Sequence, residues 1–132
     1  MKTSGTIIIV GGGVVGSSIA YHLRRDGHDG PLLVIERDPT YARASSALAM
    51  GGVRQQFSSA VNIQLARYGR RFYSEFDDAM RVPGHRPSIN FRSRGYLFLV
   101  DERSSRRFEA RVEQQRALGA RVVRLDLDTL AD

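Results

Sequence analysis

The chain opens with two short apolar runs separated by an amphipathic stretch. Residues 6–10 and 32–36 are rich in β-branched and aliphatic side chains, which predicts two buried strands. Between them, residues 14–26 carry apolar side chains at helical spacing, and Gly27 gives the helix a stop. This order of elements predicts a βαβ unit and hence an α/β fold of the Rossmann-like type.

A long helix is predicted after a loop of small residues at 38–57. Apolar side chains recur every three or four positions through residues 61–80, and Ser58 or Ser59 can cap the start of the helix. The Pro-Gly pair at 83–84 then interrupts the chain.

The remainder of the chain predicts a change of architecture. Residues 89–91 and 96–100, joined by a turn at Gly95, have the pattern of an antiparallel hairpin. Further expected elements are a helix at about 105–118, a strand at 121–125 and a helix start at Thr129. A hairpin after a βαβ unit indicates a second, α+β domain, so we expect a first domain over 1–80 and the start of a second over 88–132.

Glycines mark the turn between the first strand and the first helix. Gly11, Gly13 and Gly16 form a GxGxxG pattern, and Glu36 ends the second strand twenty residues later. Gly11 permits a tight turn, Gly13 lets a pyrophosphate approach the backbone, and Gly16 lets the helix pack near the strand. The helix start presents free N–H groups to the phosphates, and Glu36 can accept hydrogen bonds from an adenosine ribose. The pattern predicts a dinucleotide site, against the alternative of a glycine-rich turn that binds nothing.

Composition narrows the function classes. The 132 residues are 42% hydrophobic and 26% charged, as in a globular protein, and the absence of cysteine excludes disulfides and thiolate chemistry. Lys2 is the only lysine, and the arginines behind the net charge of +6 are interleaved with acids, so we expect no nucleic-acid partner. The three histidines are scattered, which predicts surface residues and no metal site. No signal peptide or membrane span is visible, so we expect a cytoplasmic protein.

The loop after Glu36 bears on the choice between flavin and nicotinamide. Arg37 is followed by a stretch at 43–54 that is rich in alanine, serine and paired glycines. Such a stretch can lie against a flat ligand and donate hydrogen bonds to it. It also fits a mobile surface loop or a helical turn in which Ala and Ser are filler, and spacing alone leaves both interpretations open.

Together these residues resemble the amino-terminal part of FAD-dependent oxidoreductases of the D-amino-acid oxidase superfamily, which includes glycine oxidase, sarcosine oxidase and dimethylglycine dehydrogenase. The resemblance rests on the 11–16 turn, the pair Glu36-Arg37, the pair Ser45-Ser46 and the string Gly-Gly-Val-Arg-Gln-Gln-Phe-Ser at 51–58, with 94–99 similar to the first strands of the family's substrate domain. It implies non-covalent FAD, because the flavin loop has no histidine or cysteine for attachment. The implied cofactor-binding residues are Gly11, Gly13, Val14, Val15, Gly16, Glu36, Arg37, Ser45, Ser46, Met50, Gly51 and Gly52.

The same resemblance implies an activity: oxidation of a C–N bond in a small-molecule amine or amino acid by hydride transfer to the flavin. Arg54 is the candidate for a catalytic role, since its guanidinium could stabilise a reduced ring or clamp a substrate carboxylate; the alternative is an ordinary solvent-facing arginine. Family members run to several hundred residues, so we expect an amino-terminal part that is inactive alone.

Two alternative functions stay open at this point. One is a non-catalytic flavin- or nucleotide-binding module for assembly or scaffolding, and the other is an NAD-dependent dehydrogenase. Glu36 disfavours NADP because an acid there repels a 2′-phosphate. Neither the substrate, nor the electron acceptor, nor the oligomeric state follows from these residues.

Overall fold

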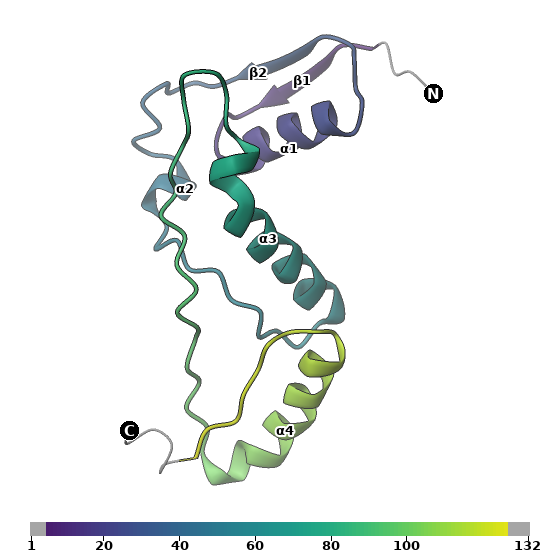
Figure 1. The fold of residues 1–132 in the computed structure, drawn as a ribbon, viewed down its shortest axis with the longest axis vertical. Coiled ribbons are helices and arrows are strands. Elements are labelled where there is room, and N and C mark those ends of the chain that lie inside the picture. Colours follow the sequence, from purple (N-terminus) through teal and green to yellow (C-terminus); the bar gives the residue numbers. More distant parts are fainter. Residues whose placement is uncertain (1–4, 127–132) are drawn as a thin grey trace. The chain divides into compact units, whose positions relative to one another are not determined.

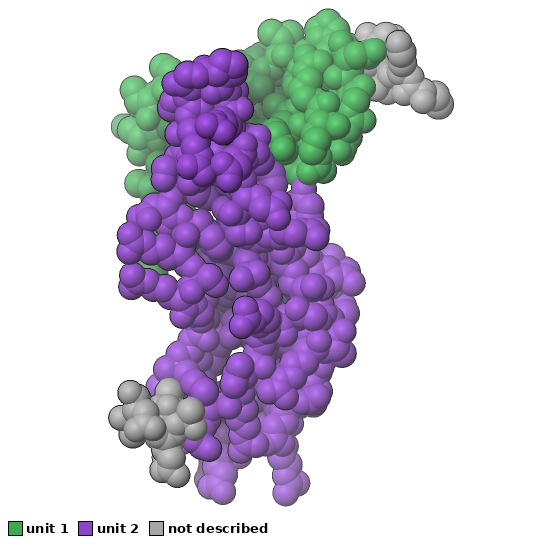
Figure 2. Space-filling view, in the orientation of Figure 1, with its two compact units in different colours: residues 1–52 green, residues 53–132 purple. Residues whose placement is uncertain are grey.

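A computed structural model describes residues 5–126 of the chain. Its elements, in chain order, are β1 (Ile7–Val10), α1 (Val14–Arg25), β2 (Leu32–Ile35), α2 (Ser45–Leu48), α3 (Ala60–Ala79) and α4 (Glu102–Ala117) (Figure 1). The chain divides into two compact units, Met1–Gly52 and Val53–Asp132, coloured separately in Figure 2. The domain limits of 1–80 and 88–132 stay a prediction, because they concern the domains of a whole protein.

The first unit contains the predicted βαβ arrangement. β1 and β2 pair in parallel, with Ile7 opposite Leu32 and Val10 opposite Ile35. Ile9 is buried under α1, whereas Val10 on the same strand is 85% exposed. The predicted strand–helix–strand order is therefore confirmed, and one turn of helix, α2, lies within the loop that the sequence placed at 38–57.

A compact connection joins α1 to β2. Gly27 leaves the helix with a φ of 95°, and the guanidinium of Arg24 donates hydrogen bonds to the carbonyls of His28 and Gly30 at 2.9 Å each. His28 is only 7% exposed, so its prediction as a surface histidine is wrong. These bonds hold the connection together, and Gly30 lies against the imidazole, with its Cβ position 3.1 Å from the Cε1 atom of His28. The spacing of apolar residues does not encode this tertiary arrangement.

The second unit is built on α3 and α4. Ile63 of α3 is fully buried, and the Arg67 guanidinium donates to the carbonyl of Leu118 at the end of α4, at 2.7 Å. The buried Gln115 of α4 donates to the carbonyl of Phe57 at 2.9 Å. These polar contacts join the carboxyl end of α4 to α3 and to the segment before it.

The two helix starts in this unit differ. Ser59 is the residue before α3, but its side chain makes no capping hydrogen bond. Asp101 caps α4, because its carboxylate accepts a hydrogen bond from the Ser104 N–H at 2.8 Å. This cap explains why α4 begins at Glu102, earlier than the predicted start near residue 105.

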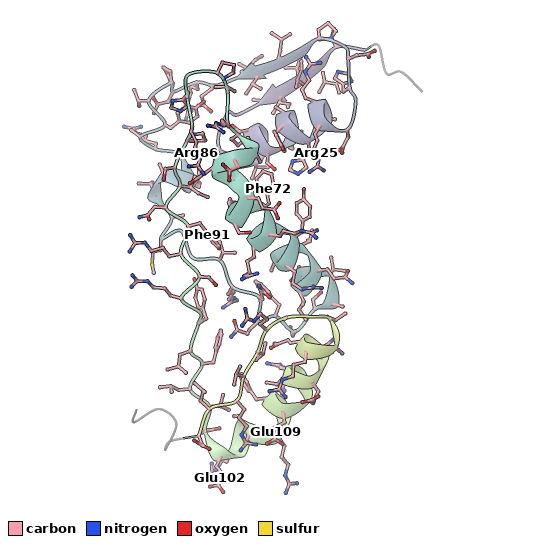
Figure 3. All side chains as sticks on the ribbon, in the orientation of Figure 1. Arg25, Phe72, Arg86, Phe91, Glu102 and Glu109 are labelled. Carbon is pink, nitrogen blue, oxygen red and sulfur yellow. The ribbon has the colours of Figure 1, made fainter. Side chains whose placement is uncertain are left out.

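The predicted hairpin at 89–91 and 96–100 is wrong, since neither segment forms a strand. Asn90 adopts a φ of 51°, in the left-handed region, which breaks an extended run. The N–H of Ile89 donates to the Asp77 carboxylate of α3 at 3.0 Å. The ring of Phe91, which is labelled in Figure 3, stacks on the ring of Tyr73 with 6.2 Å between the two centroids. Residues 89–91 thus pair with α3 in place of a second strand.

The strand predicted at 121–125 is also absent from the structure. This segment is held to α4 through side chains: Arg124 forms an ion pair with Glu109 at 2.8 Å, and Arg116 donates to the carbonyl of Val122 at 3.0 Å. The predicted helix start at Thr129 lies outside the described residues. Within residues 5–126, none of the helices has the length and apolar character needed to cross a membrane.

Candidate functional site

The turn from β1 into α1 is shaped by its glycines. Gly11 has a φ of 100°, and its N–H donates to the carbonyl of Ile35 at 2.7 Å, which extends the pairing beyond the strands. A Cβ on Gly16 would lie 1.9 Å from the carbonyl oxygen of Gly11. The predicted roles of these two glycines, a tight turn and a close helix–strand approach, are confirmed.

The amino end of α1 is open. Gly13 is the residue before the helix and offers no side-chain cap, and there is no acid in the first turn. Among the described residues, none accepts a hydrogen bond from the N–H groups of Val14, Val15 or Gly16, whereas the Ser17 N–H is bonded to the carbonyl of Gly13 at 2.9 Å. Free N–H groups and the positive end of the helix dipole make such a start suitable for an anion.

Glu36 lies directly after β2 and bonds back to the turn. One carboxylate oxygen accepts from the Gly12 N–H at 2.7 Å, and the other accepts from the Asp38 N–H at 2.9 Å. The hydrogen bond from Asp38, followed by that from Gly12, lowers the pKa of Glu36 below its ordinary value. The carboxylate is therefore held ionised and keeps lone pairs for a further donor.

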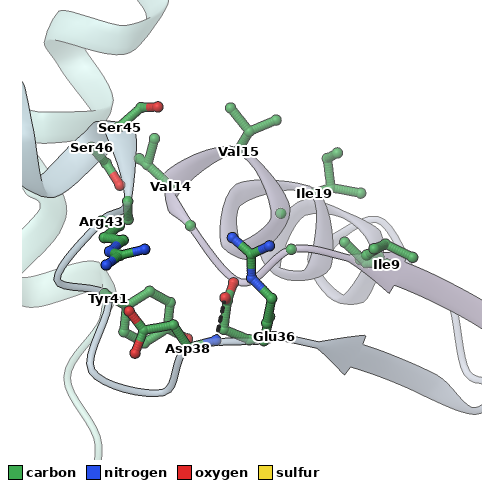
Figure 4. Close-up of a pocket in the computed structure, with 16 residues that line it drawn as sticks. Ile9, Val14, Val15, Ile19, Glu36, Asp38, Tyr41, Arg43, Ser45 and Ser46 are labelled. Atoms are coloured by element: carbon green, nitrogen blue, oxygen red, sulfur yellow. Dashed lines mark hydrogen bonds between the residues drawn. The ribbon is translucent and has the colours of Figure 1, made fainter.

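These groups surround a cavity of about 800 Å³ that lies wholly in the first unit (Figure 4). All the predicted cofactor residues line it except Met50, Gly51 and Gly52: the set brought together is Gly11, Gly13, Val14, Val15, Gly16, Glu36, Arg37, Ser45 and Ser46. The Ser46 hydroxyl lies 3.7 Å from the position a Cβ on Gly13 would occupy. A hydroxyl donor thus faces the helix start, close to the backbone of Gly13.

The remaining predicted residues lie away from this cavity. Met50 is fully exposed, and Gly51 and Gly52 end the first unit. Arg54 belongs to the second unit, where its guanidinium carbon lies 4.7 Å from the ring centroid of Phe57 and 5.9 Å from that of Phe98. Such distances are those of cation–π contacts.

Sequence reasoning missed several side chains that line the cavity, chiefly Asp38, Tyr41 and Arg43. Asp38 accepts from the Thr40 hydroxyl at 2.6 Å and the Thr40 N–H at 3.0 Å, which lowers the pKa of Asp38 and turns the chain back toward the cavity. The sequence Asp-Pro-Thr at 38–40 is typical of a turn, so this reversal of the chain could have been predicted.

Tyr41 is held against the glycine turn. Its backbone has a φ of 57°, and a Cβ on Gly12 would lie 2.7 Å from the Tyr41 hydroxyl and 3.3 Å from the Glu36 Cβ. Gly12 occupies a variable position of the GxGxxG pattern, so the pattern gives no reason for a glycine there. The tyrosine gives that reason.

The sequence profile of the FAD dependent oxidoreductase family matches residues 6–132. The chain belongs to the FAD dependent oxidoreductase family. It is 42% identical over 128 residues to the FAD-dependent oxidoreductase domain-containing protein 1 of Xenopus laevis, covering 94% of this chain and 26% of that protein. It is also 42% identical over 120 residues to the Bos taurus protein of the same name, covering 88% and 25%.

Membership of this family confirms the resemblance and implies a Rossmann-like FAD-binding fold, in agreement with the parallel βαβ unit. The chain spans about a quarter of the length of the curated relatives it matches. A shorter match, 36% identical over 70 residues, is to a 4-methylaminobutanoate oxidase (formaldehyde-forming) of Paenarthrobacter nicotinovorans, covering 53% of this chain and 8% of that protein. No solved structure matches the chain.

Proposed function

We propose that the whole protein is an FAD-dependent oxidoreductase that oxidises a C–N bond of an amine or amino acid, and that this chain binds the adenosine diphosphate half of FAD without a covalent link. One observation carries the binding proposal. The free N–H groups at the start of α1 and the ionised carboxylate of Glu36 open onto the same cavity. A dinucleotide needs this pair of sites, one for its phosphates and one for its ribose.

Different residues of the cavity bind different parts of the nucleotide in this proposal. The N–H groups of Val14 and Val15 donate to a phosphate, with the bare backbone of Gly13 allowing its close approach. Ser45 and Ser46, which also line the cavity, offer hydroxyl donors to the same phosphates. Glu36 accepts a hydrogen bond from a ribose hydroxyl, because two backbone donors already fix the orientation of its carboxylate.

Bound FAD supplies the hydride acceptor for the reaction. Met50, Gly51 and Gly52 follow the cavity wall in the sequence, and we assign them to the flavin end of the cofactor. Arg54 keeps its proposed role near the reacting centre. Since the rings of Phe57 and Phe98 lie near its guanidinium and no described residue hydrogen-bonds to it, its N–H groups remain for an anion, either the reduced ring or a substrate carboxylate.

The choice of a C–N bond is supported by one relative. The protein of Paenarthrobacter nicotinovorans is named as an oxidase of 4-methylaminobutanoate that forms formaldehyde, and its match to this chain covers about half of the chain. An N-methylated amino acid offers both a C–N bond and a carboxylate. This chemistry is compatible with a role for Arg54 as a carboxylate clamp.

The test is to purify the whole protein and record its absorption spectrum. We expect a yellow protein with flavin bands, FAD released on denaturation, and bleaching of the bands when an amine or amino-acid substrate is added without oxygen. Colourless protein that melts at higher temperature with NAD would contradict the proposal in favour of a dehydrogenase. Bound FAD that none of a broad panel of amines and amino acids bleaches would favour the non-catalytic module.

A further inference from the structure

Resting on the proposed function, we infer that Arg43 binds the diphosphate of the dinucleotide, so that a side-chain cation joins the start of α1 in recognising it. Arg43 lines the cavity together with Gly13, Val14 and Ser46 (Figure 4). It lies on the loop between β2 and α2, outside the glycine fingerprint, and neither the GxGxxG pattern nor Glu36 points to it.

The acidic and the basic side chains of the cavity differ in how many hydrogen bonds they already make. Its acids, Glu36 and Asp38, already accept hydrogen bonds from nearby N–H or hydroxyl groups. The guanidinium groups of its arginines, Arg37 and Arg43, have no hydrogen bond or ion pair with any residue in the described part of the chain. The unsatisfied groups are therefore cationic donors, which suits a ligand that brings negative charge.

The neighbouring residues in the sequence favour Arg43 over Arg37 as the arginine that binds the diphosphate. Ser46, three residues after Arg43, has its hydroxyl 3.7 Å from the Cβ position of Gly13, at the start of α1. Arg37 instead follows Glu36 directly, next to the carboxylate assigned to the ribose. Arg37 is thus the neighbour in sequence of the acid assigned to the ribose, and Arg43 is close in sequence to the serine that faces the start of α1.

The backbone that carries Arg43 is held on both sides. The Tyr41 N–H donates to the carbonyl of Asp38 and the Ala44 N–H donates to that of Tyr41, each at 3.0 Å. The Leu48 N–H donates to the carbonyl of Ala44 at 3.1 Å, which starts α2 directly after this turn. A turn that is already fixed lowers the conformational entropy lost when the guanidinium binds a phosphate.

The guanidinium geometry leads to a ranking of substitutions. An arginine can donate two parallel hydrogen bonds to phosphate oxygens, whereas a lysine acts as a point charge and a glutamine carries no charge. Binding should therefore weaken from arginine through lysine to glutamine. The affinity for ligands that lack the diphosphate should be the same in all three proteins.

The experiment measures binding of FAD, ADP and riboflavin to the full chain and to Arg43→Gln and Arg43→Lys, by calorimetry or flavin fluorescence. Arg25→Gln is the matched control, because Arg25 is an exposed arginine of the same unit that pairs with Asp26 and does not line the cavity. We expect Arg43→Gln to weaken FAD and ADP binding by about tenfold or more and to reduce their salt dependence. Arg43→Lys should give an intermediate loss, and the control none.

Two results would overturn the inference while the proposed function stands. One is Arg43→Gln binding FAD and ADP as tightly as the unsubstituted protein. The other is a loss of affinity accompanied by a lower melting temperature of the ligand-free protein, which would make Arg43 a structural residue. If the unsubstituted protein binds neither FAD nor ADP, the proposed function itself fails and the inference falls with it.

Discussion

The carboxylate of Glu36 is hydrogen-bonded to the backbone N–H of Gly12 at 2.7 Å, across 24 residues of sequence. This bond ties the end of β2 to the turn that follows β1. It also fixes the orientation of the carboxylate beside the cavity. The acid assigned to the ribose is thus part of the framework that holds the phosphate turn, and substitutions at Glu36 affect folding as well as binding.

We expect Glu36→Gln to lower the stability of the chain at neutral pH, because an amide cannot accept both backbone hydrogen bonds as well as a carboxylate does. The folded-state pKa of Glu36 is below its ordinary value of about 4.3. Its stabilising effect is therefore present above that pH and is lost as the pH falls through the lowered pKa.

The measurement is urea unfolding of both proteins at pH 7 and at pH 3. The difference in unfolding free energy between them should be larger at pH 7 and shrink at pH 3. Acids that do not interact with Glu36 titrate equally in the two proteins and cancel, whereas Asp38 is coupled to Glu36. A difference of the same size at both values would show that the carboxylate charge of Glu36 contributes nothing.

Gly16→Ala should destabilise the first unit strongly. The added methyl group would lie 1.9 Å from the carbonyl oxygen of Gly11, and a backbone group cannot move aside cheaply. We expect a loss on the order of 3 kcal/mol in the unfolding free energy, measured by denaturant. Gly69→Ala in α3 is the control, since nothing lies within 4 Å of its Cβ position; it should stabilise by about 1 kcal/mol. Equal effects of the two changes would argue against the close helix–strand approach.

Gly12→Ala should be partly rescued by Tyr41→Phe. The new Cβ would lie 2.7 Å from the Tyr41 hydroxyl, and removing that oxygen relieves the closest contact. Since contact with the Glu36 Cβ at 3.3 Å remains, the rescue should be incomplete. A double-mutant cycle on unfolding free energy should give a favourable coupling of about 1 kcal/mol, and additive effects would contradict the packing of Tyr41 on the turn.

Asp101→Ala should cost about 1 kcal/mol of stability, because it removes the hydrogen bond from Ser104 that caps α4. Ser59→Ala at the start of α3 should have an effect below about 0.5 kcal/mol, since the Ser59 side chain makes no capping bond. Thermal unfolding of the two variants side by side tests the contrast. A larger loss from Ser59→Ala would reverse our assignment of the caps.

The βαβ unit could be predicted because its information is local. Apolar runs, a glycine turn and an acid at fixed spacing are sufficient to predict β1, α1, β2 and the residues of the phosphate turn. The helix α3 could be predicted equally well, because its apolar residues recur every three or four positions. The cavity brings together the predicted site residues of the glycine turn and the start of α1 with Glu36, and adds Arg37, Ser45 and Ser46 from the loop after β2.

The failures lie where tertiary contacts replaced local pattern. The pattern of residues 89–91 predicts a strand. In the structure, however, the Ile89 N–H donates a hydrogen bond to the Asp77 carboxylate, and the Phe91 ring stacks on that of Tyr73. Tyr41 and Arg43 were not predicted as site residues because they reach the cavity through a reversal of the chain. The spacing of residues in the sequence does not predict which side chains such a reversal brings to a cavity.

The central claim is that this chain holds the adenosine diphosphate half of FAD, and a competition experiment tests it most directly. FAD bound to the chain is titrated with ADP and, separately, with riboflavin, while flavin fluorescence reports release. We predict that ADP displaces FAD and that riboflavin does not, because we propose that the cavity lined by Gly11, Gly13, Glu36 and Ser46 binds the phosphates and the ribose. Displacement by riboflavin without displacement by ADP, or no binding of FAD at all, would contradict the claim.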